Sequence, residues 1–384
     1  MRATLRLATL VGAVSLIAVS SASAQLVVSA NDGKAIITNG VAGVPDKPTA
    51  DNITVIDISK SPAKIIAEIK APTSVVGPPS SVAVNRDQSL ALVTAAQKLD
   101  PADAKKTIPD NKVSIIDLKA NPPALVSTVE AGAGAAGVAF NPAGTLALVA
   151  NRSEGTVTVF KVEGKTLTAT GKINLGNDKS GPSAIAFTPD GKMALVTRDG
   201  DSKISVLTID GTTVTDSKRE MSAGMRPYPL DIASHGRVAV LSNIGIGSGD
   251  ADTVSLIDLK ANPPRIVETV SVGQTPEGLK ISPDGRFVAV TAMEGSNKPT
   301  NSPFFRDYGS VVIFAIKGRK LDKVTESKVG HWCQGVAWSP DSKKVFVQCM
   351  VENEIQAFNF NGTRLRRSGE IKVTGGPAGI GTAK

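Results

Sequence analysis

Histidine, cysteine and aromatic residues are all scarce in this sequence. Its 384 residues include two histidines and two cysteines, and aromatic residues make up 4% of the total. Two cysteines are too few for a scaffold built on disulfides, so a hydrophobic core must hold the fold together. The sequence has neither the Cys/His spacing of a zinc site nor a C-x-x-C-H motif for covalent haem. We therefore expect no metal and no cofactor.

Long hydrophobic runs are missing except near the N-terminus. Two arginines precede an apolar run at 7–19, and small residues follow it at 22–24, which is typical of a secretory signal peptide. The run is shorter than the roughly 20 residues needed to cross a bilayer, although a membrane anchor is the alternative interpretation. We predict a signal peptide at 1–24, a single domain at 25–384, and a periplasmic or secreted protein without a transmembrane segment after cleavage.

The charge is only modestly unbalanced. Lysine and arginine exceed the acidic residues by a formal charge of +8, which favours acidic partners weakly and does not by itself indicate nucleic acid. Binding of single-stranded nucleic acid also needs aromatic rings on which the bases stack, and aromatic residues are scarce here. We expect a small polar or anionic ligand or an envelope protein as the partner, and regard nucleic acid as an unlikely one.

No segment shows the periodicity of a long helix, but the chain repeats. One phrase alternates apolar residues around a tight turn, and its turn residues recur at intervals that indicate a solenoid, an array or a propeller. The clearest copies are "GVAFNPAGTLALVAN" from 137, "AIAFTPDGKMALVTR" from 184, "LKISPDGRFVAVTA" from 279 and "GVAWSPDSKKVFVQC" from 335.

Each repeat contains four predicted strands, which we call a to d. Strands a and b flank the turn, strand c is rich in β-branched residues, and strand d is more polar, as an outer strand should be. The hexapeptide LKANPP occurs at 118–123 and 259–264, in both cases between strands c and d. Four strands in about 45 residues match one blade, so we predict an all-β, seven-bladed β-propeller with four-stranded antiparallel blades.

The two ends of the domain together complete the seventh repeat. Residues 376–384 resemble the start of a strand a, whereas 26–32 resemble a strand b and 52–58 a strand c. We favour a first blade in which the C-terminal strand closes the ring, because this leaves no open sheet edge. In the alternative, 26–30 and 35–38 are strands a and b, and the last residues form a tail.

The ends of the predicted strands b carry a family resemblance. They read LVAN at 148–151, LVTR at 195–198, VLSN at 240–243 and LVTA at 92–95. With these motifs in register, the chain resembles the YVTN-repeat β-propellers. The resemblance implies an exported bacterial protein, related more distantly to lactonase-type propellers, and does not fix a reaction.

The two faces of such a propeller differ in sequence. The a–b turns are short, whereas four b–c loops are enlarged, at 31–51, 95–111, 244–252 and 292–309. Long loops on one face of a rigid scaffold are a common place for binding, although tolerated drift or a solvated rim would give the same pattern. The ligand-binding residues that we predict on this face are Arg226, Tyr228, Glu277, His331, Trp332, Asn151, Arg198, Asn243 and Glu294, with Asp199 beside them.

Catalytic patterns are weak, so the presence of an enzyme activity is uncertain. Of the two histidines, His235 lies in an a–b turn on the other face, and only His331 is placed to act on a ligand. A lactonase could instead use Glu277 as an acid or base and Arg226 to polarise a carbonyl. Our main interpretation is an exported binding or scaffold module, and the alternative is a lactonase-like hydrolase of sugar-acid or related lactones.

The two cysteines fall in one repeat. Cys333 is in its strand a and Cys349 in its strand b, nearly opposite each other across the turn. Export favours a disulfide if the register brings them together. Two small buried hydrophobic residues are the alternative.

A first prediction concerns the proposed face. Replacing Arg226 and Glu277 together, with the fold retained by circular dichroism, should abolish binding of the ligand found in a thermal-shift screen of lactones and sugar acids, because these residues supply the charges at its centre. Binding that survives the double substitution would move the site elsewhere.

Overall fold

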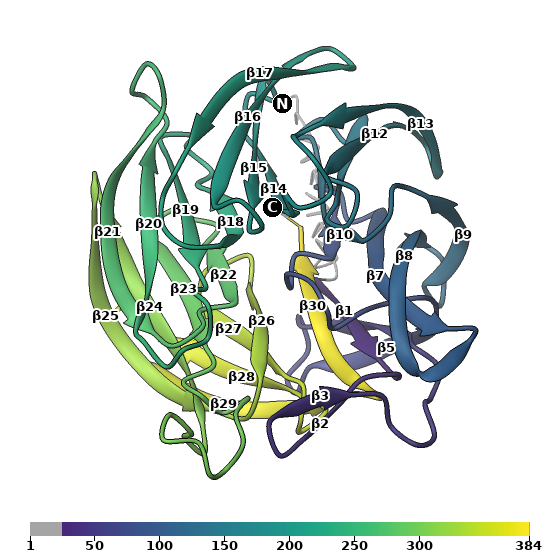
Figure 1. Cartoon of the computed structure of the whole chain (residues 1–384), viewed down its shortest axis with the longest axis vertical. Helices are drawn as coiled ribbons and strands as arrows, with labels where there is room; N and C mark the ends of the chain where they lie inside the picture. The colour runs from purple at the N-terminus through teal and green to yellow at the C-terminus, as the bar shows by residue number, and fades with distance from the viewer. Residues whose placement is uncertain (1–24, 384) are drawn as a thin grey trace, which may run out of the picture.

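The computed structural model describes residues 25–383, and these form a ring of β-sheets around a central channel. Seven sheets of four antiparallel strands make up the ring, so the predicted fold is confirmed for this part of the chain (Figure 1). Residues 25–383 contain no α-helix, and hence no helix that is long and apolar enough to cross a membrane. The predicted signal peptide lies outside the described residues.

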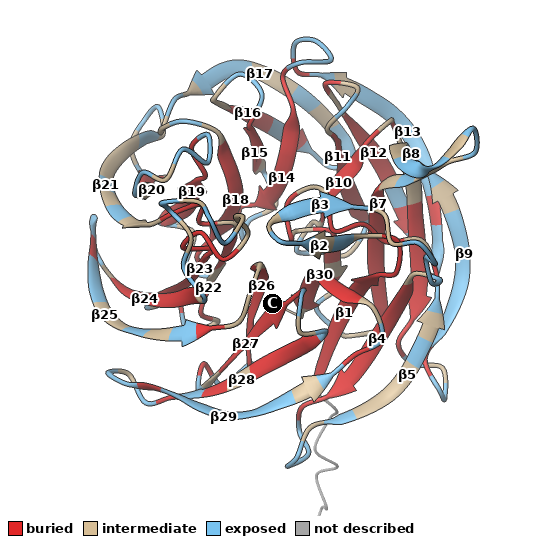
Figure 2. Ribbon diagram, turned by 60° about the horizontal axis from the view of Figure 1, so that its bottom comes forward, coloured by how far each residue is buried: buried red, intermediate tan, exposed pale blue. Residues whose placement is uncertain are grey.

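In each blade, strand a lines the channel and strand d lies at the outer edge of the ring. Apolar residues on both faces bury strands a to c, while the more polar strands d are largely exposed (Figure 2). The first four blades, in the order a to d, are β30 (Gly376–Thr382), β1 (Leu26–Asp32), β4 (Asn52–Asp57), β5 (Lys64–Lys70); β6 (Val82–Val84), β7 (Leu90–Asp100), β8 (Asp103–Asp117), β9 (Ala124–Glu130); β10 (Ala135–Phe140), β11 (Leu146–Asn151), β12 (Thr156–Glu163), β13 (Thr166–Asn174); and β14 (Pro182–Phe187), β15 (Met193–Arg198), β16 (Lys203–Asp210), β17 (Thr213–Met221).

The remaining blades continue the same order around the ring. In blades 2 and 5 the hexapeptide LKANPP forms the turn between strands c and d, as the repeat predicts. Blades 5 to 7 consist of β18 (Pro227–Ile232), β19 (Val238–Asn243), β20 (Asp252–Asp258), β21 (Arg265–Gly273); β22 (Gly278–Ile281), β23 (Phe287–Ala292), β24 (Gly309–Lys317), β25 (Lys320–Val329); and β26 (Cys333–Trp338), β27 (Lys344–Cys349), β28 (Glu354–Phe360), β29 (Leu365–Lys372).

The hydrophobic core is divided among the spaces between blades. Each pair of neighbouring blades encloses its own buried apolar cluster in the described part of the chain. Between blades 7 and 1, for example, Phe346 and Ile355 pack against Val27, Ile56 and Ile380. Burying both faces of every sheet requires a partner on each side, which only a closed ring provides.

Blade 1 combines distant parts of the chain. Strand β1 lies between β30 and β4, with Val28 opposite Gly381 on one side and Val55 on the other. Residues 36–38 do not join this sheet. They form β2 (Ile36–Thr38), which pairs with β3 (Val41–Gly43) in a small hairpin that stands on the face of the b–c loops (Figure 2).

Two further features refine the predictions from sequence. Residues 95–111, expected to be a loop, instead extend β7 and β8 into a long hairpin, with Lys98 opposite Ile108. Cys333 and Cys349 are directly opposite each other in β26 and β27 and form a disulfide.

Ring closure can be tested with two isoleucines. Ile380 on the closing strand is 6% exposed, so Ile380→Ala should lower the free energy of unfolding by about 2–4 kcal/mol through lost burial and a residual cavity. Ile36→Ala removes the same atoms from a side chain that is 41% exposed, so it should change the free energy of unfolding by less than about 0.5 kcal/mol. Urea unfolding measures both, and equal effects would contradict the closing role of β30.

Candidate active site

The channel mouth on the b–c face is built from equivalent positions in successive blades. In blades 3 to 7 the residue just before or at the start of strand a has positive φ, and its carbonyl accepts the backbone N–H of the residue that follows strand b. Glycine takes this position in blades 3 and 4, but Arg226, Thr275 and Trp332 take it in blades 5 to 7. Positive φ is costly for such side chains, and retained strain of this kind clusters at functional sites.

Asp199 is the centre of the charged cluster at this mouth. Its side chain is 2% exposed and lies between two guanidinium groups. Arg152 donates from Nε to Oδ1 at 2.9 Å and from Nη2 to Oδ2 at 2.7 Å, and Arg226 donates from Nη2 to Oδ2 at 3.0 Å. The hydroxyl of Ser183 also donates to Oδ1. Blades 3, 4 and 5 thus share one carboxylate, which fixes the orientation of two arginines.

These partners decide the charge of Asp199. Burial on its own disfavours the ionised form of Asp199. The hydrogen bonds and the charge of Arg152, together with the hydrogen bonds from Ser183 and Arg226, outweigh burial and lower the pKa of Asp199. The pKa of Arg152 is raised despite its burial, chiefly by Asp199. At neutral pH the cluster therefore holds two guanidinium cations and one ionised carboxylate.

Glu277 adds a second carboxyl group with the opposite behaviour. It lies one residue before β22, at the position of Tyr228 in blade 5, and keeps some contact with water although protein surrounds it. Burial raises the pKa of Glu277 to about 7, against the opposing effects of Arg226, Trp332 and Arg152. A carboxyl group that is half ionised at neutral pH can take up or release a proton in a reaction.

Two aromatic side chains border this carboxyl group. Tyr228 is buried, which raises the pKa of its hydroxyl and keeps it protonated, and the guanidinium carbon of Arg152 lies 5.9 Å from its ring centre. The indole Nε1 of Trp332 is buried and makes no hydrogen bond of standard geometry within residues 25–383, although the indole lies near enough to Glu277 to affect its pKa. It is a donor at the edge of the site, placed beside the carboxyl group of Glu277.

His331 lies on the rim, outside the cluster. Its Nδ1 is 2.6 Å from Oε1 of Glu352, and its Nε2 is 2.8 Å from Oδ1 of Asp307 in the enlarged loop of blade 6. Burial disfavours the charged imidazole, but the two carboxylates prevail and raise the pKa of His331. An imidazole whose two ring nitrogens are both held by carboxylates is a tether between loops, so the structure does not support His331 as a catalytic group.

Three predicted site residues point into the blades instead of the channel. The amide of Asn151 donates to Oγ1 of Thr156 and of Thr158, both at 2.8 Å. Asn243 makes the equivalent bonds in blade 5, and Glu294 accepts a hydrogen bond from Ser310. These side chains join strands b and c of one blade, so they do not belong to the cluster.

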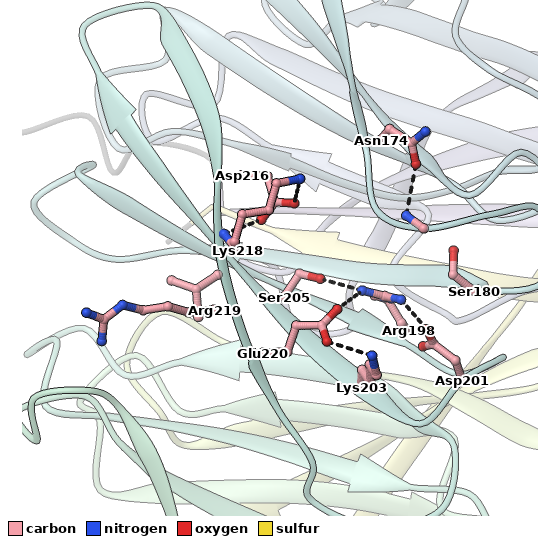
Figure 3. A network of polar contacts seen from close by, with 12 residues as sticks. Asn174, Ser180, Arg198, Asp201, Lys203, Ser205, Asp216, Lys218, Arg219 and Glu220 are labelled. Carbon is pink, nitrogen blue, oxygen red and sulfur yellow. Dashed lines mark hydrogen bonds and ion pairs between the residues drawn. The ribbon is translucent and has the colours of Figure 1, made fainter.

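Arg198 is also directed away from the channel. It lies in a polar pocket at the outer side of blade 4, where its guanidinium group donates to Ser205, Glu220 and Asp201 (Figure 3). Lys203 contacts the same Glu220. The predicted role of Arg198 as a ligand-binding residue of the mouth is therefore not supported by its position.

Arg152 is the residue that the analysis of the sequence missed. It follows β11 directly, as Asp199 follows β15, so both occupy the same position in their repeats. An alignment of the repeats that includes the residue after strand b places Arg152 beside Asp199.

The far end of the channel is different in character. A cavity of about 350 Å³ opens there, on the side of the a–b turns, and its walls are mostly aliphatic strand-a side chains such as Val138, Leu230 and Ile281. The charged pair in it is Asp231 and Lys280, 3.8 Å apart. This apolar space lies at the end opposite the cluster, so we place the chemistry at the charged mouth.

Comparisons with known proteins agree with the fold. Residues 112–244 match the family model described as "Lactonase, 7-bladed beta-propeller", and residues 183–333 match that of a "Choice-of-anchor I domain". Neither is a model of YVTN repeats, so that family stays a resemblance of the motifs. No curated protein sequence matches the chain.

Solved structures with the same fold are numerous and distant in sequence. A candidate 6-phosphogluconolactonase from Bacteroides uniformis has a TM-score of 0.72 at 19% identity, covering 94% of this chain and 99% of its own. The periplasmic gluconolactonase of Pseudomonas aeruginosa has 0.66 at 18%, covering 94% and 99%. Hydrazine synthase of Kuenenia stuttgartiensis has 0.63 at 19%, covering 82% and 91%. At such identities these likenesses show the fold alone.

The raised pKa of Glu277 predicts a pH-dependent stability. Between about pH 4.5 and 7 the folded protein keeps the proton that the unfolded chain releases, so the free energy of unfolding falls as pH rises through this window. Glu277→Gln, which is neutral in both states, should remove this fall, whereas Glu163→Gln, at the exposed last residue of β12, should follow the wild type. Urea unfolding at several pH values measures this pH dependence. Parallel plots of the free energy of unfolding against pH for wild type and Glu277→Gln would refute the buried, protonated state of Glu277.

Proposed function

We propose that the protein is a hydrolase of small acidic lactones, the alternative of our two interpretations of the sequence. The observation that carries the proposal is a carboxyl group with a pKa near 7, Glu277, beside two guanidinium groups fixed on one buried carboxylate. The match to a lactonase family model and the names of the similar structures support the same choice, since two of these are gluconolactonases or candidates for that activity.

The proposed reaction uses Glu277 as a general base. Its carboxylate takes a proton from a water molecule while the water oxygen attacks the lactone carbonyl carbon. The resulting oxyanion is stabilised by N–H groups of Arg152 or Arg226, which need no reorientation because Asp199 already holds them. The ring C–O bond then breaks, and protonated Glu277 returns its proton to the leaving oxygen, giving a hydroxy acid.

The charge of the mouth favours an anionic substrate. Two guanidinium groups face one ionised carboxylate and one half-ionised one, so the cluster has an excess of positive charge. One arginine can bind a carboxylate or phosphate of the substrate while the other stabilises the oxyanion. A sugar-acid lactone that carries a phosphate fits this division of roles. Export to the periplasm or beyond stays part of the proposal.

Turnover by the purified protein tests this function. Proton release from glucono-δ-lactone, its 6-phosphate and a neutral γ-lactone is followed in a pH-stat and corrected for spontaneous hydrolysis. Glu277→Gln should lower kcat by about 10²–10⁴-fold, the usual contribution of a general base, with Glu163→Gln as the matched control. The value of kcat/KM should rise with pH through about 7, as Glu277 ionises. Tight binding without turnover would instead favour the binding module.

The two arginines give a second test. Arg152→Lys keeps a positive charge but cannot bind Asp199 through two parallel hydrogen bonds, so the guanidinium geometry is lost. We expect a fall of about 10²-fold in kcat/KM for the acidic lactone, of the size seen when an oxyanion donor is removed. An unchanged value would exclude Arg152 from the reaction.

A further inference from the structure

The hairpin β2–β3 is an insertion whose role the fold does not explain. It lies between strands b and c of blade 1 and adds nothing to the sheet of that blade. Its base is fixed by buried Lys34, whose Nζ is 2.7 Å from Oδ2 of Asp51 and 2.5 Å from the carbonyl oxygen of Thr73. A backbone hydrogen bond from Thr49 to Gly33 closes the base. The hairpin is therefore anchored firmly where it leaves blade 1.

The tip of the hairpin is fixed as well, on the enlarged loop of blade 6. Oδ1 of Asn39 accepts the backbone N–H of Thr300 at 2.9 Å. The backbone of Gly40, at φ 73°, lies so close that a Cβ atom there would be 2.0 Å from the carbonyl carbon of Lys298. The hairpin thus connects blades 1 and 6, and blade 7 lies between them in the ring.

Trp332 of blade 7 and the inner side of this bridge pack on the same apolar cluster. Ala35 and Ile37 join a small apolar cluster of Val75, Met350 and Ala378, and Trp332 packs on the same cluster. On the opposite side of the hairpin, Val41 is 64% exposed. The alternation of the strand therefore directs one set of side chains toward the cluster that Trp332 also contacts, and the other into solvent.

Trp332 itself has an unfavourable backbone conformation. Its φ is 44°, a region in which a bulky residue persists only when its surroundings impose it. Its N–H donates to Oγ of Ser296 in the same blade 6 loop, and its carbonyl accepts the N–H of Met350. The loop, the hairpin and blade 7 together supply these surroundings.

From these contacts we infer that the β2–β3 hairpin is a positioning element, which clamps Trp332 against Glu277 and so completes one wall of the site. Ile37 and Gly40 are its positioning residues, the first by packing and the second by allowing the close backbone contact with Lys298. The inference rests on the proposed function for its effect on catalysis, but not for its effect on Trp332. It also gives the buried indole Nε1 a role, as the donor that favours the ionised form of Glu277.

Two matched pairs of variants test the clamp. Gly40→Val places a side chain against the backbone of Lys298, whereas Gly43→Val in the same hairpin meets no atom within 4 Å. Ile37→Ala removes packing on the cluster of Trp332, whereas Ile36→Ala changes an exposed neighbour. The second pair keeps the test valid if Gly40→Val does not fold.

The first readout does not depend on turnover. The sequence has two tryptophans, so a Trp338→Phe background leaves Trp332 as the source of tryptophan fluorescence. We expect its emission to change near pH 7 as Glu277 ionises, and Glu277→Gln to remove this change and leave only that of neighbouring His331. Gly40→Val and Ile37→Ala should shift the midpoint to higher pH by about half a unit or more, because the indole no longer favours the carboxylate. The controls should keep the wild-type midpoint.

The second readout is the pH profile of kcat/KM for the best lactone. The same two variants should move its lower limb to higher pH by the same amount, while Gly43→Val and Ile36→Ala leave it in place. If Gly40→Val and Ile37→Ala match their controls in fluorescence, the clamp is overturned. If fluorescence shifts but no variant, nor the wild type, hydrolyses a lactone, the clamp stands and the proposed hydrolase fails.

Discussion

Every blade of this protein has two apolar faces, and the need to bury both of them determines the rest of the structure. Each pair of neighbouring blades encloses a separate cluster, such as that of Phe346 and Ile380 between blades 7 and 1. A sheet with two such faces is stable only between two others, so the ring closes and its innermost strands converge on one axis. Convergence is what brings Arg152, Asp199 and Arg226 from three blades within hydrogen-bonding distance.

The two carboxyl groups at the mouth have pKa values shifted in opposite directions. Asp199 and Glu277 are both enclosed by protein and both lie near arginines, yet burial prevails at Glu277 and hydrogen bonds prevail at Asp199. The difference is one of contact: Asp199 receives hydrogen bonds from two guanidinium groups, whereas no guanidinium hydrogen bond to Glu277 is formed in the described structure. One carboxylate is therefore a structural anion, and the other is left free to exchange a proton.

Periodicity in the sequence was enough to predict the fold, because turn residues, alternation and repeat length all agree on a propeller. It also pointed to Arg226, Tyr228 and Glu277 at the starts of strands a, where Tyr228 and Glu277 hold equivalent positions and Arg226 corresponds to Thr275 and Trp332. The prediction from periodicity failed at the end of strand b, because successive side chains there point to different sides. Asn151 forms hydrogen bonds within its own blade, whereas the next residue, Arg152, contacts Asp199 of the neighbouring blade. The strand pairing of 95–111 was missed too, since polar residues and prolines there are typical of a loop.

The chain order of blade 1 has a consequence for how the molecule folds. Its inner strand, β30, pairs with β1 across more than 300 residues of sequence, so this contact has the highest loop-closure cost of the fold and belongs to the late steps of folding. Blades 3 to 5, which supply Arg152, Asp199 and Arg226, are consecutive and need no such distant partner. The charged centre of the mouth can therefore assemble before the ring is complete, whereas the hairpin of blade 1 is ordered with the last step. A complete mouth, with the hairpin in place, would then mark the final closure of the ring.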